Sequence, residues 1–149
     1  MAGAAVEDKR LVPAVILGLG DGAMSILGIV AYGSRHPAVV LPLAASGALS
    51  AALSMGANEW LSESGEGFTA GLAMGGATLC GSVLPAWPFA VFPRAVAPLV
   101  TLLMLALVAA AVGRMRAGRR HPYAETVGVL AAIAAASVTL ALLLPGGTA

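Results

Sequence analysis

Five long apolar stretches occupy nearly the whole of this 149-residue chain, and they constrain its fold more than any other feature. They run over about residues 11–33, 38–61, 68–92, 95–113 and 124–144. Each is long enough to cross a bilayer as a helix, which takes about 20 apolar residues. Only 10% of the residues are charged, against about 25% in soluble domains, so the chain lacks the polar surface of a water-facing fold. The sequence therefore predicts an all-α integral membrane bundle of five transmembrane helices, formed as one domain over residues 1–149.

The distribution of Lys and Arg predicts how the bundle is oriented. A signal peptide is an alternative for the N-terminus, but the apolar run after "MAGAAVEDKR" is too long and lacks an A-x-A-like cleavage site. With five spans, the N-terminus shares one side with two connections, and that side holds six basic residues: Lys9, Arg10, Arg114, Arg116, Arg119 and Arg120. The other side holds only Arg35 and Arg94. The positive-inside rule places the N-terminus in the cytoplasm and the C-terminus outside the cell or in an organelle lumen.

A single carboxylate, Asp21, lies near the middle of the first stretch, in "LGLGDGAMSILGIVAYG". An acid at a helix centre costs about 2.5–3.5 kcal/mol on insertion scales, so it usually faces a bundle interior or a polar cavity. On a helical projection, small, polar and sulfur-bearing residues surround it: Ala14, Leu17, Gly18, Met24, Ser25, Gly28 and Tyr32. The opposite arc is apolar and is expected to face lipid: Val12, Val15, Ile16, Leu19, Ala23, Ile26, Leu27 and Val30.

The second stretch separates its residues in the same way. One arc holds small and polar residues with one thioether: Gly47, Ala51, Ser54, Met55, Asn58, Glu59 and Ser62. The other side holds Leu49, Leu53, Ala57, Trp60 and Leu61. Met55 and Glu59 are four residues apart, so they are neighbours, with Met55 about 6 Å deeper than Glu59 at 1.5 Å per residue. Glu59, Met55 and Asp21 thus descend in that order from the cytoplasmic surface toward the bilayer centre.

These three side chains suggest a metal path. Carboxylate oxygens attract divalent cations, and a thioether favours later transition metals over Mg²⁺ or Ca²⁺. A buried carboxylate can also exchange a metal ion for protons. Each residue has a structural reading too: Met55 as core filler, Glu59 as a solvated helix end, and Asp21 as a hydrogen-bond partner of another helix. Their shared arcs favour a site, with Met24, Ser25 and Asn58 as accessory residues.

Three stretches resemble the vacuolar iron transporter family. "GLGDGAMSILGIVAYG" is similar to its first-helix signature, and "GALSAALSMGANEWLSESG" is similar to its second helix. "GGATLCGSVLPAWPFAVF" resembles its Gly-rich third helix. The resemblance implies a homodimer of five-helix protomers that exports Fe²⁺, and often Mn²⁺, from the cytosol in exchange for protons. It places the family's helix-one acid on Asp21, its helix-two methionine on Met55 and the following acid on Glu59.

The chain departs from that family at three places. Gly20 stands where the family has Asn before the acid, and Asn58-Glu59-Trp60 stand where it has Gly-Glu-Tyr. Many members carry a Glu-rich, metal-gathering helical insertion between helices two and three, whereas this connection is only "SESGEGF". Glu63 and Glu66 in it are either a cation-attracting remnant or a solvated acidic turn.

Three other features bear on packing and on the class of partner. Gly71 and Gly75 form a G-x-x-x-G pattern, which indicates a helix-packing or dimer face. Three prolines, Pro85, Pro88 and Pro93, are expected to break or kink the third helix near its outer end. The basic stretch "GRMRAGRRHPY" could be a nucleic-acid patch, but beside a membrane it is more simply a topogenic loop that contacts anionic lipid.

The sequence favours a transporter over other classes. No Ser/His/Asp or Cys/His arrangement lies at membrane depth, so no enzyme is predicted, and the only expected ligands are the transported Fe²⁺ or Mn²⁺ and protons. A non-transporting membrane module, or an assembly partner of a metal-handling complex, stays open as an alternative. A transporter of organic cations would need aromatic walls, and the chain has only two Trp, two Tyr and three Phe. The abundance of Ala and Gly and the preference for Arg over Lys favour a bacterial plasma membrane, with a vacuolar membrane expected in a eukaryote.

Overall fold

The computed structural model describes residues 2–33, 37–62, 67–116 and 121–143 of the chain, and this part is helical with short connections. The elements are α1 (Ala2–Gly33), α2 (Pro37–Ser62), α3 (Phe68–Ala86), α4 (Pro88–Val91), α5 (Ala97–Met115) and α6 (Pro122–Leu143). Five segments are long and apolar enough to cross a membrane: Leu11–Ala31, Ala38–Ser62, Phe68–Val91, Ala97–Met115 and Pro122–Leu140. The predicted all-α bundle of five membrane-spanning helices is confirmed, and its bounds agree closely with the apolar stretches.

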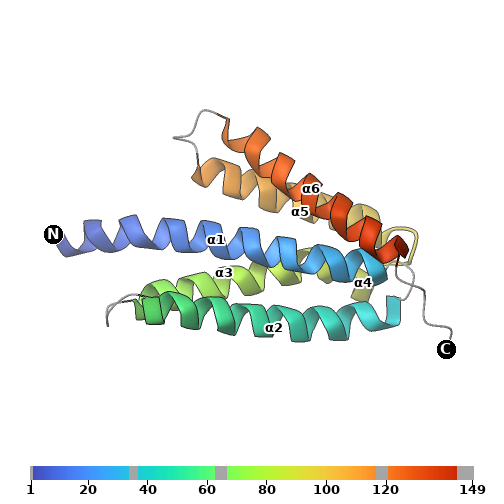
Figure 1. The fold of residues 1–149 in the computed structure, drawn as a ribbon, viewed down its shortest axis with the longest axis horizontal. Coiled ribbons are helices and arrows are strands. Elements are labelled where there is room, and N and C mark those ends of the chain that lie inside the picture. Colours follow the sequence, from blue (N-terminus) through green and yellow to red (C-terminus); the bar gives the residue numbers. More distant parts are fainter. Residues whose placement is uncertain (1, 34–36, 63–66, 117–120, 144–149) are drawn as a thin grey trace.

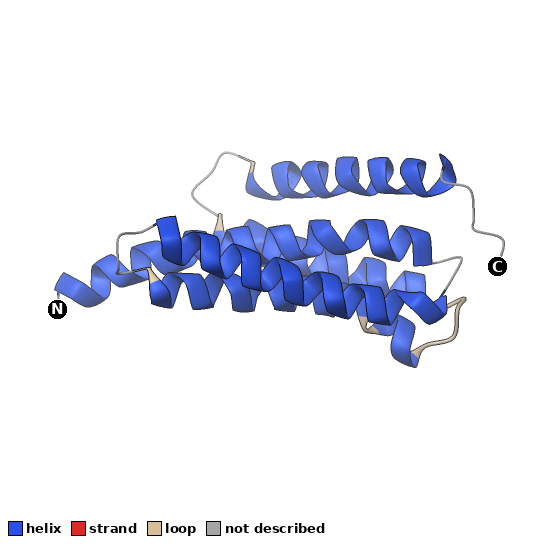
Figure 2. Ribbon diagram, turned by 60° about the horizontal axis from the view of Figure 1, so that its bottom comes forward, coloured by secondary structure: helices blue, strands red, loops and turns tan. Residues whose placement is uncertain are grey.

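The helix α1 runs along the middle of the molecule. Figure 1 shows α2 and α3 on one side of it and α5 and α6 on the other. The last helix, which leads to the C-terminus, lies along the outside of the bundle (Figure 2). The helices α1, α2 and α3 make their most extensive contacts with one another, and the buried share of a span ranges from 44% in α3 to 6% in α6. The bundle therefore has a tight part, made by the first three spans, and a loosely attached pair, α5 and α6.

Backbone contact holds α1 against α3. A Cβ atom added at Gly22 would collide with the Thr78 carbonyl oxygen and would lie 3.0 Å from the Ser82 Oγ atom, and one at Gly18 would collide with the Met74 carbonyl oxygen. The Ser82 hydroxyl donates to the carbonyl oxygen of Gly22 at 3.1 Å, across the interface. Helices in lipid associate through such close approach of small residues and interhelical hydrogen bonds. This contact fixes the turn of α1 that carries Asp21.

The G-x-x-x-G pattern of α3 packs within the chain. A Cβ at Gly71 would stand 2.6 Å from the carbonyl oxygen of Gly56 on α2, and one at Gly75 would stand 2.8 Å from that of Ala52. Of the two roles that the sequence left open for this pattern, packing against α2 is the one observed. The large residues on the apolar side of α2 are exposed: Leu49, Leu53, Trp60 and Leu61. The first three lie beside this contact and line a shallow groove between α2 and α3.

The outer end of the third span is broken, as its prolines predict. The helix α3 ends at Ala86, and the single-turn helix α4 starts at Pro88. Proline has no N–H to donate, so a continuous helix would leave carbonyl groups without donors. The buried Thr101 hydroxyl of α5 donates to the Pro85 carbonyl oxygen at 2.8 Å. This bond satisfies one carbonyl at the break and ties α5 to α3.

The expectation that the apolar arc of the first span faces lipid is wrong for its central part. Ala23, Ile26 and Leu27 are buried, with Ile26 only 1% exposed. Ala23 packs against α5, and Ile26 packs against α2 and α3. By contrast Leu17, on the same arc as Asp21, is 57% exposed, and Ser25 is also exposed. Lipid tails are as apolar as a leucine side chain, so hydrophobicity alone does not choose which face turns inward. The small residues that allow backbone contact make that choice here.

Candidate metal-binding groove

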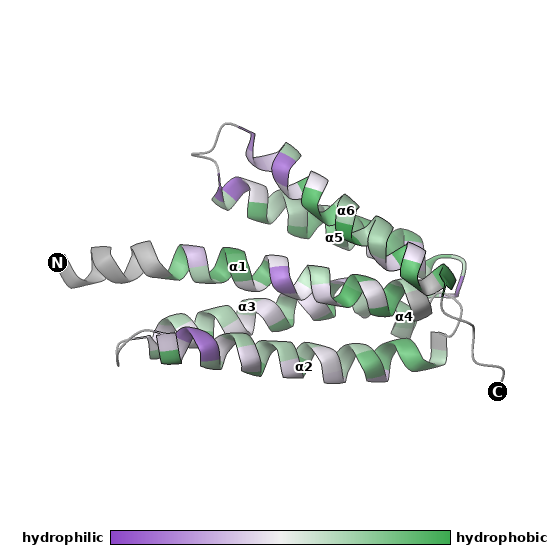
Figure 3. Cartoon of the chain, viewed as in Figure 1, coloured by the Kyte–Doolittle hydropathy of each residue, from purple (hydrophilic) through white to green (hydrophobic). Residues whose placement is uncertain are grey.

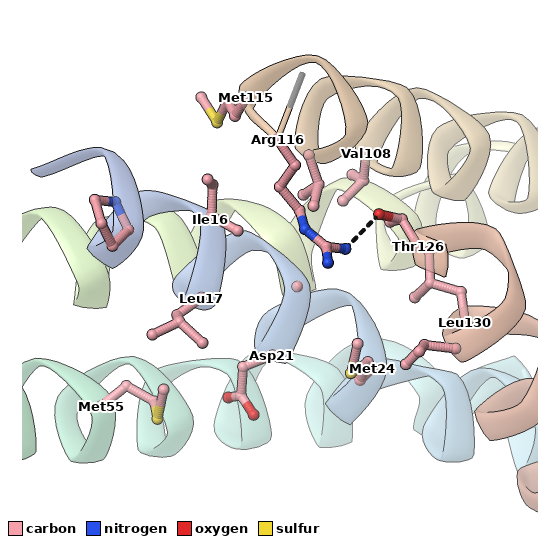
Figure 4. Close-up of a pocket in the computed structure, with 14 residues that line it drawn as sticks. Ile16, Leu17, Asp21, Met24, Met55, Val108, Met115, Arg116, Thr126 and Leu130 are labelled. Carbon is pink, nitrogen blue, oxygen red and sulfur yellow. Dashed lines mark hydrogen bonds between the residues drawn. The ribbon is translucent and has the colours of Figure 1, made fainter. Parts of the chain in front are cut away.

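A groove of about 730 Å³ runs along α1 between α2 on one side and α5 and α6 on the other; we call it the α1 groove (Figure 4). Its floor is the face of α1 that the contact with α3 leaves open. Fourteen described residues line it: Pro13, Ile16, Leu17, Gly20, Asp21, Met24, Met55, Val108, Val112, Met115, Arg116, Thr126, Val129 and Leu130. Most are apolar, so its few polar and sulfur atoms define what chemistry it offers.

Asp21, Met24 and Met55 all line the α1 groove. In Figure 4 the Asp21 carboxylate lies between the Met55 and Met24 side chains along the length of α1. Asp21 and Met24 are three residues apart and share a helix face. Met55 comes from α2, where it packs against a buried cluster that contains Met74. All three groups are half-buried, so each is held by the fold while remaining open to the groove.

The other wall of the α1 groove carries a cation that is already paired. The Arg116 Nη1 atom donates to the Thr126 Oγ1 atom at 3.0 Å, and its Nη2 atom donates to the Glu125 Oε2 atom at 2.8 Å. Thr126 in turn donates to the Pro122 carbonyl oxygen at 2.7 Å. These bonds join the end of α5 to the start of α6 and hold the guanidinium group against α6 (Figure 4).

Sequence reasoning treated Arg116 only as a topogenic charge and did not identify Met115 or Thr126 as groove residues. The available signal was weak: Arg116 and Glu125 are opposite charges nine residues apart at the ends of two adjacent spans. That spacing is compatible with an ion pair across a short connection. Nothing in it indicates that the pair borders the same groove as Asp21.

The other predicted site residues lie apart from this group. Glu59 is half-buried on α2, one helical turn or about 6 Å from Met55, and is not among the described residues lining the α1 groove. Ser25 and Asn58 are exposed and do not line it either. Glu63 and Glu66 lie outside the described residues.

The donor set of the α1 groove is one carboxylate and two thioethers, with a third thioether from Met115 farther along the wall. Within the described ranges, no three His, Cys, Asp or Glu side chains come together as a closed metal site. Structural metal sites usually surround their ion with protein ligands, whereas a cation in transit must be able to leave. The remaining ligands in this groove would be water or groups from a second copy of the chain.

Hydrophilic residues also mark the ends of the bundle. Figure 3 shows strongly hydrophilic positions of α5 and α6 at the same end of the molecule as the N-terminus of α1, with the hydrophilic part of α2 also toward that end. Arg114 and Arg116 belong to that end of α5. The opposite end, where α4 leads to α5, carries Arg94. Charge is thus asymmetric along the axis of the described bundle.

Comparison of the chain with protein-family models, with curated proteins and with solved structures finds no match. A function must therefore be argued from the chain itself. Three findings carry such an argument: five membrane-spanning helices, a groove along the central one, and a carboxylate flanked by thioethers within that groove.

Proposed function

We propose that this protein is a proton-coupled transporter of the iron-transporter type, which moves Fe²⁺ or Mn²⁺ out of the cytoplasm. The observation that carries the proposal is the position of the Asp21 carboxylate beside the Met55 and Met24 thioethers in one groove of a membrane-spanning helix. A carboxylate at that depth is costly unless it faces a cavity or a partner, and such acids commonly mark ion paths. Because the same oxygens accept either a proton or a metal ion, they can exchange one for the other.

The direction of the path follows from charge and depth. Asp21 is ten residues into the span Leu11–Ala31, or about 15 Å at 1.5 Å per residue. The α1 groove extends from there toward Pro13, near the end of the span that the N-terminus precedes. The Lys and Arg bias supports a cytoplasmic N-terminus, so a cation from the cytoplasm would pass Glu59 and Met55 before it meets Asp21. Composition favours a bacterial plasma membrane.

A homodimer is part of the proposal. The face of α1 that carries Asp21 is only partly covered, and Leu17 beside it is 57% exposed. A second copy seated on this face would remove the carboxylate from lipid and could supply further ligands. The glycines Gly18 and Gly22 are used within the chain against α3, so the interface would involve the groove face instead.

The lining of the α1 groove favours an inorganic cation over an organic one. Among the described residues that line it, none is aromatic. Organic ammonium groups are typically held by aromatic faces through cation–π contacts. Carboxylate and thioether groups instead match a transition metal ion.

Metal flux into proteoliposomes tests the proposal. Wild type should carry Mn²⁺ and Fe²⁺ down their gradients with counter-movement of protons, followed by an internal pH dye. Asp21→Asn keeps the volume and removes the charge, and we expect it to lower flux at least about tenfold, equivalent to about 1.4 kcal/mol. Met55→Leu should lower flux as well, while Met104→Leu, on α5 outside the described groove lining, serves as the matched control.

Undiminished flux in Asp21→Asn would refute the proposed function. Absence of flux in wild type, together with a stable protein that co-purifies, would replace it with the non-transporting alternative. Metal flux without any proton movement would refute the coupling and leave a metal channel or uniporter. Each variant is first compared with wild type by its elution from size-exclusion chromatography, so that loss of folding is not read as loss of transport.

A further inference from the structure

The α1 groove is unusually rich in sulfur. Three of the six methionines in the chain, Met24, Met55 and Met115, line it, and a fourth, Met74, packs behind Met55. Methionine fills irregular gaps in many cores. Here, however, Met24 and Met55 lie on either side of the Asp21 carboxylate and border open space. Their placement therefore gives the groove two soft donors around one hard one.

The Met24 side chain lies near Gly20 on the same helix. Its terminal methyl group lies 4.0 Å from the point where a Cβ atom would stand on Gly20, and both residues line the α1 groove. The side chain of Met24 thus folds back along α1 toward the turn that contains Asp21. An alanine at position 20 would make an ordinary van der Waals contact with this methyl group. Met24 thus brings a thioether, a softer donor than an amide or hydroxyl group, to the groove one turn along α1 from Gly20.

Charge also distinguishes the cations that one groove can neutralise. Asp21 contributes one negative charge, and the Arg116–Glu125 ion pair on the opposite wall sums to zero. A monovalent cation beside Asp21 gives a neutral group within a single copy, whereas a divalent cation needs a second negative charge, which the second copy of the proposed dimer would supply. Uncompensated charge is costly at membrane depth. Thioether ligands, moreover, select Cu(I), which accepts few ligands, over harder divalent ions.

From these observations we propose that the α1 groove binds a soft monovalent cation of the Cu(I) class through Met24, Met55 and Asp21, with Met24 setting the preference for it. This inference rests on the proposed function, because it uses the same groove, and it extends the substrate class to a chemically different ion. The step is binding alone, so copper enters and stays as Cu(I) and no electron is transferred. Ag⁺, which needs no reductant, is the practical probe.

The test measures Ag⁺ and Mn²⁺ binding to the full-length protein in lipid nanodiscs in chloride-free buffer, by isothermal titration calorimetry. Wild type is expected to bind about one Ag⁺ per chain. Met24→Leu removes the sulfur at nearly constant volume, a change that cores tolerate well. It should lower the ratio of Ag⁺ to Mn²⁺ affinity about tenfold, as expected when a soft ligand is lost from a soft cation. Met104→Leu is the control and should leave both affinities unchanged.

A second measurement reports on the ligands directly. X-ray absorption of the Cu(I)-loaded protein, prepared under ascorbate, should show sulfur scatterers in wild type and fewer of them in Met24→Leu. An unchanged Ag⁺ to Mn²⁺ ratio in Met24→Leu would overturn the inference, as would an equal fall in Met104→Leu or a Cu(I) shell without sulfur. Ag⁺ binding to wild type and Met24→Leu decides this inference, whereas Mn²⁺ flux through wild type and Asp21→Asn decides the proposed function. Sulfur-dependent Ag⁺ binding without Mn²⁺ flux would support this inference alone.

Discussion

Gly22→Ala is the substitution that most directly tests whether contact between α1 and α3 holds the site in place. The added methyl group would collide with the Thr78 carbonyl oxygen and lie 2.9 Å from the Ser82 backbone nitrogen. Backbone atoms cannot rotate away as the end of a side chain can, so the two helices must separate. Separation would also weaken the 3.1 Å hydrogen bond from the Ser82 hydroxyl to the Gly22 carbonyl oxygen.

The size of the effect follows from two opposing contributions. Overpacking a well-packed interface costs about 1–3 kcal/mol, and replacing Gly by Ala within a helix returns about 0.5–1 kcal/mol. Because the clash is with backbone atoms, the cost should fall at the upper end of its range, and we expect Gly22→Ala to lower the free energy of unfolding by about 2 kcal/mol. Gly76→Ala is the matched control, because a Cβ there meets nothing within 4 Å, and it should be neutral or slightly stabilising.

The assay is unfolding by sodium dodecyl sulfate from mild detergent micelles, followed by the fluorescence of Trp60 and Trp87, which flank α3. Gly22→Ala should unfold at a lower dodecyl sulfate fraction than wild type. Under conditions where it remains folded, its Mn²⁺ flux should also fall, because Asp21 is the adjacent residue. Identical unfolding curves for Gly22→Ala, Gly76→Ala and wild type would refute backbone contact between α1 and α3.

Two further substitutions test the contacts of α5. Thr101→Val removes the hydroxyl that donates to the Pro85 carbonyl oxygen and should lower the free energy of unfolding by about 1 kcal/mol, while Thr101→Ser should retain most of it; the same dodecyl sulfate titration distinguishes them. Arg116→Gln breaks the ion pair between α5 and α6 and should cost less than about 1 kcal/mol, because the pair is partly exposed. Its cost should shrink in high salt, and a salt-independent loss would contradict an electrostatic role.

The membrane spans could be predicted closely because the bilayer itself sets their length. A helix must satisfy its backbone hydrogen bonds internally in lipid, so any long apolar stretch has a single regular structure available to it. The break after the third span was equally accessible, since Pro88 cannot donate a hydrogen bond and α3 ends at Ala86. These features depend on local chemistry and on the solvent, and both can be inferred from the sequence.

Which face of each helix is buried in the bundle was harder to predict. Ile26 and Leu17 are both large and apolar, yet one is buried and the other exposed. In water such a difference would show in the hydrophobic pattern, but in lipid it depends on which residues let backbones approach. The four-residue spacing of Gly18 and Gly22 indicates the face of α1 that contacts α3, and the same spacing of Gly71 and Gly75 indicates the face of α3 that contacts α2. Small residues at this interval would therefore have identified the inner face of α1.

Part of the candidate site could be predicted from the spacing of residues along one helix. Asp21 and Met24 share a helix face by spacing alone, so periodicity was sufficient to group them. Met55 lines the same groove only because of the way α1 packs against α2. The opposite wall of the α1 groove depends on where α5 and α6 pack against α1. Arg116 reaches that wall through a contact with α6 that no local pattern specifies. Periodicity therefore indicated part of the donor set but not the groove that contains it.

Charge balance gives the half-covered position of Asp21 a physical explanation. An acid sealed in the core of one chain would need a fixed partner, and a cation could not displace that partner without leaving it unpaired. An acid fully exposed to lipid would bear the whole cost of insertion, about 2.5–3.5 kcal/mol. In the α1 groove Asp21 is half-buried, and the one described cation nearby, Arg116, is already bonded to Glu125 and Thr126. Under the proposed function, a mobile cation rather than a permanent one would neutralise this carboxylate.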